Sequence, residues 1–299
     1  MLAVLQRALI YQPTRDSRID VREAGLPPGQ VHTISTPTRD GLLLHGWHVL
    51  ANGQTAASSL DCDGQLTSGR WLILYFPGNA GHRGYRGAEI SIFTQAGANV
   101  FLFDYRGYAD NPGSPSEERF AADAHAVWEY AAQARGVPRE RIVLYGESIG
   151  GGVAVRLAAE LCQAGTPPGG VILRSTFSSL VDAGAYHYPW LPVRWLLVDR
   201  FPSDARIRNV TCPILQLHGT ADRIIPLDMG RRLFAAAPEK SASGVPKRFV
   251  ELPGAGHNDT LYVAAAQLRQ AIREFLESLA AAPPTESPPP TTLHGEIAP

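Results

Sequence analysis

The chain has 299 residues, of which 44% are hydrophobic and 18% charged, and its formal net charge is −1. This length and apolar content predict one large α/β domain or two small ones, with a sizeable core. A net charge close to zero gives no electrostatic basis for binding nucleic acid, so no nucleic-acid partner is expected. Cys62, Cys162 and Cys212 lack metal or redox spacing and predict reduced thiols in a cytoplasmic protein.

Residues 1–28 are interpreted as an N-terminal segment ahead of the main domain. Its apolar stretch from Met1 to Ile10 is interrupted by Gln6 and Arg7 and is too short for a signal-peptide core. No apolar run in the chain approaches the ~18 residues that a transmembrane helix needs. As a helix, the stretch fits either a peripheral contact with a membrane surface or packing on the domain's own surface.

The main domain, expected over residues 29–280, alternates strands with helices. Short apolar runs predict strands at about 31–35, 42–50, 70–76, 99–103, 142–145, 170–173, 213–217 and 248–252. Helical patterns predict helices at about 82–95, 115–135, 153–160, 227–237 and 261–279. This alternation predicts a mostly parallel, doubly wound α/β sheet, in which ligands bind beyond the carboxyl ends of the strands.

Local signals refine this picture. Ser114-Pro115-Ser116-Glu117 predicts a capping box with Pro115 at the first helical position. The polar stretch 52–69 predicts an exposed loop. Residues 176–202 carry large aromatic side chains broken by prolines, and predict a short helical cap over a site. The Pro-rich residues 281–299 predict a disordered tail.

A G-x-S-x-G pattern, Gly146 to Gly150, lies between the strand at 142–145 and a helix-compatible segment. A serine on such a sharp turn has strained backbone, and flanking residues with Cβ atoms would collide. The turn directs the Ile149 N–H, at a helix N-terminus, toward the space above Ser148, where it could stabilise an oxyanion. A chance match is the alternative, but chance would rarely also supply the strand and the helix.

Ser148 needs a base and an acid to act as a nucleophile. His257 follows the last predicted strand in a Gly-rich loop, and Asp222 follows the strand before it, so these are the candidate base and acid. Other candidates for the acid and the base fit different roles. His218 is expected to be structural, and Asp228 falls inside the next helix. His45 and His48 lie on an early strand, and His82 and His187 are expected at the substrate entrance.

The stretch Pro77-Gly78-Asn79-Ala80-Gly81 follows another strand, and the Asn79 backbone N–H is the candidate second oxyanion donor. A plain glycine turn is the alternative. In the cap, the candidate substrate-binding residues are His187, Tyr188, Trp190 and Leu191. Nine histidines without the short spacing of zinc ligands predict no metal, and no cofactor is expected.

Six segments resemble one branch of the α/β-hydrolase superfamily: YFPGNAGHRG, FDYRGYADNPGSPSE, YGESIGGG, HYPWLPVRWLLVDRF, HGTADRIIP and GAGHND. The branch includes membrane-associated α/β-hydrolase-domain proteins, some of them depalmitoylases, and bacterial esterase-like relatives. The resemblance implies Ser148 as nucleophile, Asp222 as acid, His257 as base, and Asn79 with Ile149 as oxyanion donors. Relatives usually have His in place of Pro77 and often an acidic residue in place of Arg174. Some carry a long N-terminal membrane helix, which is not expected here.

The sequence therefore predicts a cofactor-free serine hydrolase that cleaves carboxylic esters or thioesters of small-molecule or acylated substrates through an acyl-enzyme. A serine peptidase or amidase with the same triad is one alternative. A catalytically silent hydrolase fold used for binding is the other.

Overall fold

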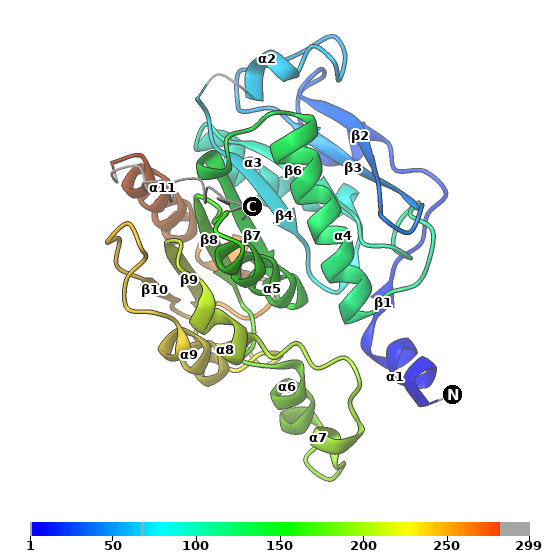
Figure 1. Cartoon of the computed structure of the whole chain (residues 1–299), viewed down its shortest axis with the longest axis vertical. Coiled ribbons are helices and arrows are strands. Elements are labelled where there is room, and N and C mark those ends of the chain that lie inside the picture. Colours follow the sequence, from blue (N-terminus) through cyan, green and yellow to red (C-terminus); the bar gives the residue numbers. More distant parts are fainter. Residues whose placement is uncertain (1, 67–68, 282–299) are drawn as a thin grey trace, which may run out of the picture.

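The computed structural model describes residues 2–66 and 69–281 of the chain (Figure 1). Its central sheet has eight strands in the order β10-β9-β8-β7-β4-β6-β3-β2. Within this sheet β3 is antiparallel to β2 and β6, and the other neighbouring strands are parallel. The prediction of a doubly wound, mostly parallel sheet is confirmed.

The sheet strands are β2 Val31–Pro37, β3 Leu43–Val49, β4 Leu72–Phe76, β6 Asn99–Phe103, β7 Ile142–Glu147, β8 Gly170–Arg174, β9 Ile214–Gly219 and β10 Arg248–Leu252. A separate two-stranded sheet pairs β1 Gln12–Pro13 with β5 Ala80–Gly81. The helices are α1 Leu2–Ile10, α2 Asp63–Leu66, α3 Gly87–Gln95, α4 Glu117–Glu129, α5 Ile149–Gln163, α6 Leu180–His187, α7 Val193–Leu196, α8 Ser203–Arg206, α9 Leu227–Ala236, α10 Thr260–Val263 and α11 Ala265–Ala281. None of these helices has the length and apolar content needed to span a bilayer.

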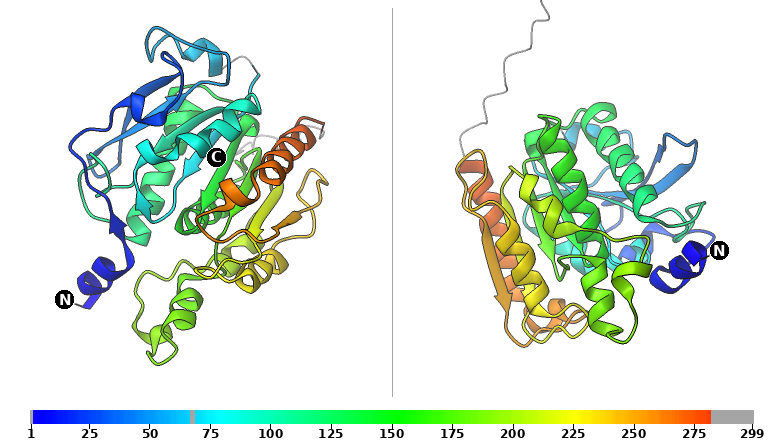
Figure 2. Two further views of the ribbon diagram at one scale, coloured as in Figure 1. Left: turned by 180° about the vertical axis from the view of Figure 1, so that it is seen from behind. Right: turned by 60° about the horizontal axis from the view of Figure 1, so that its bottom comes forward.

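Helices cover both faces of the sheet (Figure 2). One face packs against α4, α5 and α9 through a core that includes Phe120, Leu157 and Leu233. The other face packs against α3 and α11 through a second core that includes Phe93 and Phe275. Because both faces are covered, the central strands are continuous apolar runs rather than alternating ones.

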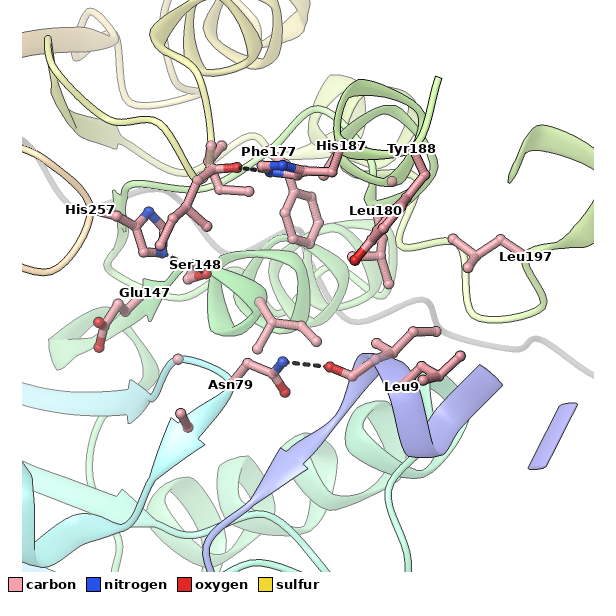
Figure 3. A pocket seen from close by; sticks show the side chains of 18 of the residues that line it. Leu9, Asn79, Glu147, Ser148, Phe177, Leu180, His187, Tyr188, Leu197 and His257 are labelled. Carbon is pink, nitrogen blue, oxygen red and sulfur yellow. Dashed lines mark hydrogen bonds between the residues drawn. The ribbon is translucent and has the colours of Figure 1, made fainter. Parts of the chain in front are cut away.

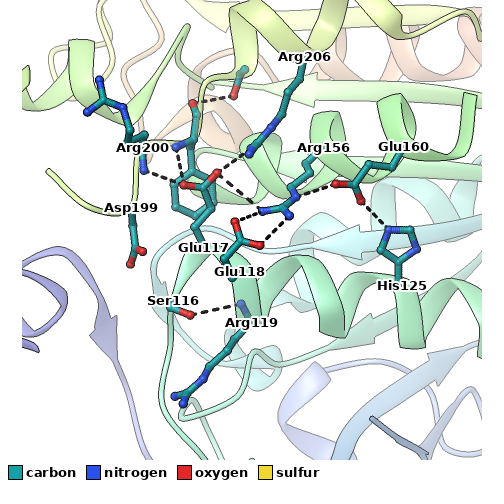
Figure 4. Close-up of polar contacts among 12 residues, drawn as sticks. Ser116, Glu117, Glu118, Arg119, His125, Arg156, Glu160, Asp199, Arg200 and Arg206 are labelled. Atoms are coloured by element: carbon teal, nitrogen blue, oxygen red, sulfur yellow. Dashed lines mark hydrogen bonds and ion pairs between the residues drawn. The ribbon is translucent and has the colours of Figure 1, made fainter. Parts of the chain in front are cut away.

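The cap at 176–202 contains α6 and α7 and is fastened to the sheet domain by the buried side chain of Glu117 (Figure 4). Glu117 Oε2 accepts hydrogen bonds from the backbone N–H groups of Arg200 and Phe201, at 2.7 and 2.9 Å. Its other oxygen pairs with Arg206 at 2.7 Å. One carboxylate at the start of α4 therefore fixes the point where the cap returns to the domain.

This role of Glu117 explains why the predicted capping box is wrong. The α4 helix begins two residues later than predicted, with Ser116 as its N-cap, and the Ser116 side chain accepts from the Arg119 N–H. Glu117 is directed toward the cap instead of back toward Ser114. At its other end α4 continues into a single π-helical turn, Tyr130–Ala134, ahead of the predicted stop at Gly136.

Two further predictions need correction. The helix expected from His82 begins as a 3-10 turn at Arg83–Arg86, because the His82 ring accepts from the Gly84 N–H and caps that turn. The loop at 52–69 is not wholly exposed, since it contains α2 and buries Cys62 and Leu66. The predicted tail was 281–299; Ala281 is the last residue of α11, and residues 282–299 lie outside the described residues.

The N-terminal helix α1 packs against the cap of its own chain. Arg7 makes two hydrogen bonds of 2.9 Å with the buried carboxylate of Asp199, which also accepts from the Tyr11 hydroxyl at 2.9 Å. The Gln6 side chain donates to the Leu196 carbonyl at 2.6 Å. The structure therefore shows α1 packed on the protein's own surface, with Leu9 left 76% exposed on its outer side.

Candidate active site

Ser148 lies at the sharp turn between β7 and α5, with φ of 53° and ψ of −119°. A positive φ at a non-glycine residue is strained, and the surrounding contacts hold it in place. The Ser148 N–H donates to the Arg174 carbonyl at 2.9 Å, and its carbonyl accepts from the Thr176 hydroxyl at 2.7 Å. A Cβ on Gly146 would lie 2.5 Å from the Gly150 carbonyl oxygen, so the glycines of the motif permit this turn.

His257 and Asp222 form a hydrogen-bonded chain with Ser148 (Figure 3 shows the serine and the histidine). His257 Nε2 lies 3.1 Å from Ser148 Oγ, and His257 Nδ1 lies 2.7 Å from Asp222 Oδ2. A carboxylate only accepts, so Nδ1 carries the proton and Nε2 of the neutral ring is free to accept from the hydroxyl. Asp222 is oriented by the N–H groups of Ile224 and Ile225, which donate to its other oxygen at 2.9 and 2.8 Å.

The loops that carry Asp222 and His257 are hydrogen-bonded to each other. The Ala221 N–H donates to the Ala255 carbonyl at 2.9 Å, and a Cβ on Gly219 would lie 2.2 Å from the same oxygen. Glycine is therefore required where the β9 and β10 loops approach. This contact sets the separation of Asp222 from His257 before any ligand binds.

The Pro77–Gly81 loop lies on the opposite side of Ser148, and the side chain of Asn79 anchors it to the N-terminal segment (Figure 3). Asn79 Nδ2 donates to the Ile10 carbonyl at 2.6 Å, and its Oδ1 accepts from the Tyr108 hydroxyl at 2.8 Å. The Tyr105 hydroxyl donates to the Pro77 carbonyl at 2.9 Å. Ile149 is the first residue of α5, so its N–H has no acceptor within the helix.

A buried charged cluster underlies the turn at the serine and was not predicted from the sequence. Glu147 Oε1 pairs with Arg174 at 2.8 Å, and Oε2 accepts from the Tyr75 hydroxyl at 3.0 Å and from Arg86 at 3.3 Å. Arg174 also donates to the Thr260 hydroxyl at 2.7 Å. The cluster thus connects the strand before the serine with the helix that follows the His257 loop.

Electrostatics keep Glu147 ionised in this position. Burial alone would raise the pKa of its carboxyl, but Arg174, Arg86 and the Tyr75 hydroxyl outweigh burial and lower the pKa to about 2. Arg174 therefore serves as the main counter-ion of Glu147.

Replacing Glu147 with glutamine should destabilise the protein by about 3 kcal/mol at neutral pH, because the buried Arg174 is left with Glu89 and the partly exposed Arg86 loses a carboxylate partner. Because the pKa of Glu147 is lowered in the folded protein, ionised Glu147 contributes its full stabilisation above about pH 4.5. This stabilisation is lost as the pH falls toward about 2. Urea unfolding should show the gap between wild type and Glu147→Gln closing on acidification. Glu277→Gln, on the exposed side of α11, is the control and should change stability by less than ~0.5 kcal/mol. A difference in free energy of unfolding that does not change with pH would contradict the conclusion that Glu147 is ionised and paired in the folded protein.

Ser148 and His257 open into a cavity of about 1100 Å³ between the sheet domain, the cap and α1. Its walls are mostly apolar, with Phe177 and Leu180 from the cap side and Leu9 from α1 (Figure 3). The four residues expected to bind substrate all line it, namely His187, Tyr188, Trp190 and Leu191. The contribution of α1 was not predicted, because it depends on contacts more than a hundred residues away in sequence, such as Arg7 with Asp199.

The competing residues lie elsewhere or have other partners. His218 is buried and donates to the Ile225 carbonyl at 2.8 Å, and burial lowers its pKa. His187 donates to the Ile224 carbonyl at 2.7 Å, which ties the cap to the Asp222 loop. His82 was expected at the substrate entrance. It is instead buried, and it is the N-cap residue of the 3-10 turn at 83–86. Asp228 is exposed on α9.

Sequence comparisons identify the family. A family model described as serine aminopeptidase S33 matches residues 67–203. The Mycobacterium tuberculosis protein Rv2307c is 40% identical over 277 residues, covering 92% of this chain and 88% of the relative. Lysophosphatidylserine lipase ABHD12 of Danio rerio is 31% identical over 268 residues, covering 83% and 70%.

Solved structures show the same fold. The esterase Pf2001 of Pyrococcus furiosus superimposes with a TM-score of 0.65 at 17% identity, covering 90% of this chain and 98% of the esterase. The α/β hydrolase GrgF from Penicillium has a TM-score of 0.63 at 18% identity, covering 86% and 100%. The chain belongs to the α/β-hydrolase superfamily, and the predicted resemblance is confirmed. Among curated proteins of known activity, it is similar in sequence to the ABHD12 lipases.

Proposed function

We propose that this protein is a serine hydrolase that cleaves carboxylic esters or thioesters carrying an apolar acyl chain. The observation that carries the proposal is the hydrogen-bonded chain of Ser148, His257 and Asp222 at an apolar cavity. The zebrafish relative is named as a lipase, which supports ester hydrolysis as the reaction class.

In the proposed mechanism, Ser148 Oγ attacks the substrate carbonyl while His257 Nε2 takes the hydroxyl proton. Asp222 keeps the ring in the tautomer required and stabilises the imidazolium that forms. The oxyanion of the tetrahedral intermediate accepts from the backbone N–H groups of Ile149 and Asn79, and one such donor is worth about 3 kcal/mol. His257 then protonates the leaving group, and water attacks the acyl-enzyme by the same route.

The cavity supports the choice of substrate. Its volume of about 1100 Å³ is at or slightly above the upper end of the usual range for ligand pockets, and its apolar walls from Phe177 and Leu180 favour an acyl chain over a polar one. A peptide backbone would leave its polar groups unpaired against such walls, which disfavours peptidase activity.

Matched substrates test this proposal. We expect kcat/KM for p-nitrophenyl esters to rise from acetyl to medium-chain acyl groups, and thioesters of the same acids to be cleaved as well. Anilides of the same acids should react much more slowly. The variant Leu180→Trp, which fills the cavity, should shift the preference toward short chains. Equal rates across all chain lengths, or anilides preferred over esters, would contradict the proposal.

A further inference from the structure

The mouth of the cavity is surrounded by exposed apolar side chains from two separate segments. Leu9 of α1 is 76% exposed, and on the cap Trp190 is 75% and Trp195 89% exposed. Leu196 and Val198 add further apolar surface beside them, at 40% and 48%. We call these five residues the rim face. Trp190 packs edge-to-face against Tyr188, with ring centroids 6.3 Å apart, yet it, Trp195 and Leu9 leave most of their surface exposed.

The two segments form one surface. In Figures 1 and 2, α1 and the α6–α7 segment protrude from the same end of the molecule. Gln6 joins them, donating to the Leu196 carbonyl at 2.6 Å and accepting from the Val198 N–H at 3.1 Å. Leu9, Trp190 and Leu196 also line the cavity, so the rim face continues directly into it.

The charged side chains of α1 and the cap are three arginines and two aspartates, a small positive excess. Arg194 and Arg200 are exposed on the cap, and the Arg7 side chain is partly exposed on α1. The carboxylates of the same segments are withdrawn, since Asp199 is buried beneath Arg7 and Asp182 is only 13% exposed beside Arg194. Arg7 and Arg194 are paired with these two carboxylates, whereas Arg200 donates to backbone carbonyls, so the net charge presented to a partner is positive but small.

From this combination we infer that the rim face docks onto the surface of an anionic phospholipid bilayer. Tryptophan side chains favour the headgroup level of a membrane, and exposed arginines attract anionic lipids. A second copy of the chain fits less well, because two positive surfaces would meet. Docking places the cavity mouth against the lipid, so that, if the proposed function holds, an acyl chain enters without crossing water.

Vesicle co-sedimentation tests the inference on the full chain. The protein should sediment with vesicles of phosphatidylcholine and phosphatidylglycerol, and less with phosphatidylcholine alone. Trp195→Asp and Leu9→Asp should each lower the bound fraction at least tenfold. Leu60→Asp is the matched control, because Leu60 is 80% exposed but lies shortly before α2, at the opposite end of the molecule in Figure 1.

Two readouts separate docking from catalysis and from self-association. Ser148→Ala should bind vesicles as wild type does, whatever its activity, because the rim face does not include the serine. Trp195→Asp should cleave a water-soluble short ester at the wild-type rate but lose activity on an ester embedded in vesicles. Equal vesicle binding by wild type and both rim variants would overturn the inference. So would sedimentation velocity showing that the rim variants dissolve a dimer and leave vesicle binding unchanged.

Discussion

Replacing Ser148 with alanine should lower kcat for ester hydrolysis by about 10⁴-fold or more while the protein remains folded. The alanine keeps the turn but removes the oxygen that His257 Nε2 contacts at 3.1 Å, so no acyl-enzyme can form. Steady-state assays with a medium-chain p-nitrophenyl ester measure the loss. Ser91→Ala, whose hydroxyl bonds only to the Gly87 carbonyl of its own helix, is the control and should keep the wild-type rate. Full activity of Ser148→Ala would remove the basis of the proposed mechanism.

Replacing Gly150 with alanine should destabilise the protein by about 3 kcal/mol or more. A Cβ at this position would lie 2.1 Å from the Phe76 carbonyl oxygen and 2.6 Å from that of Pro77. Both atoms are backbone, so relief requires moving the serine turn away from the oxyanion loop. We therefore also expect a large loss of kcat in whatever fraction remains folded.

Urea unfolding of Gly150→Ala beside Gly64→Ala isolates this effect. Among the described residues, a Cβ on Gly64, in α2, meets nothing within 4 Å, so its substitution should change stability by less than about 1 kcal/mol. Equal stabilities of the two variants would show that the turn tolerates the displacement.

Much of the fold was predictable because its determinants are local. Buried parallel strands such as Asn99–Phe103 are continuous apolar runs, and their order along the chain with helices between them implies a doubly wound sheet. The candidate site was predictable for the same reason. Ser148, Asp222 and His257 each follow a strand of that sheet, and its parallel strands end at one edge.

Other features depend on contacts that no local pattern records. The position of α1 depends on a pairing of Arg7 with Asp199, and the start of α4 depends on the bond from Glu117 to the cap. The buried cluster brings Glu89, Glu147 and Arg174 together from three elements that are distant in sequence. In each case the position of the element or side chain is decided by a contact distant in sequence, which the local sequence pattern does not record. The roles of Ser148, His257 and Asp222 and the domain boundaries stay predictions.

Labelling with a fluorophosphonate probe, followed by mass spectrometry of the digested protein, tests the central proposal most directly. One adduct is expected, on the peptide that carries Ser148; it should be absent in Ser148→Ala and suppressed by excess ester substrate. Its formation should also fall in His257→Ala, because the serine loses its base. An adduct on a different residue, or no adduct on the folded wild-type protein, would contradict the assignment of Ser148 as the nucleophile.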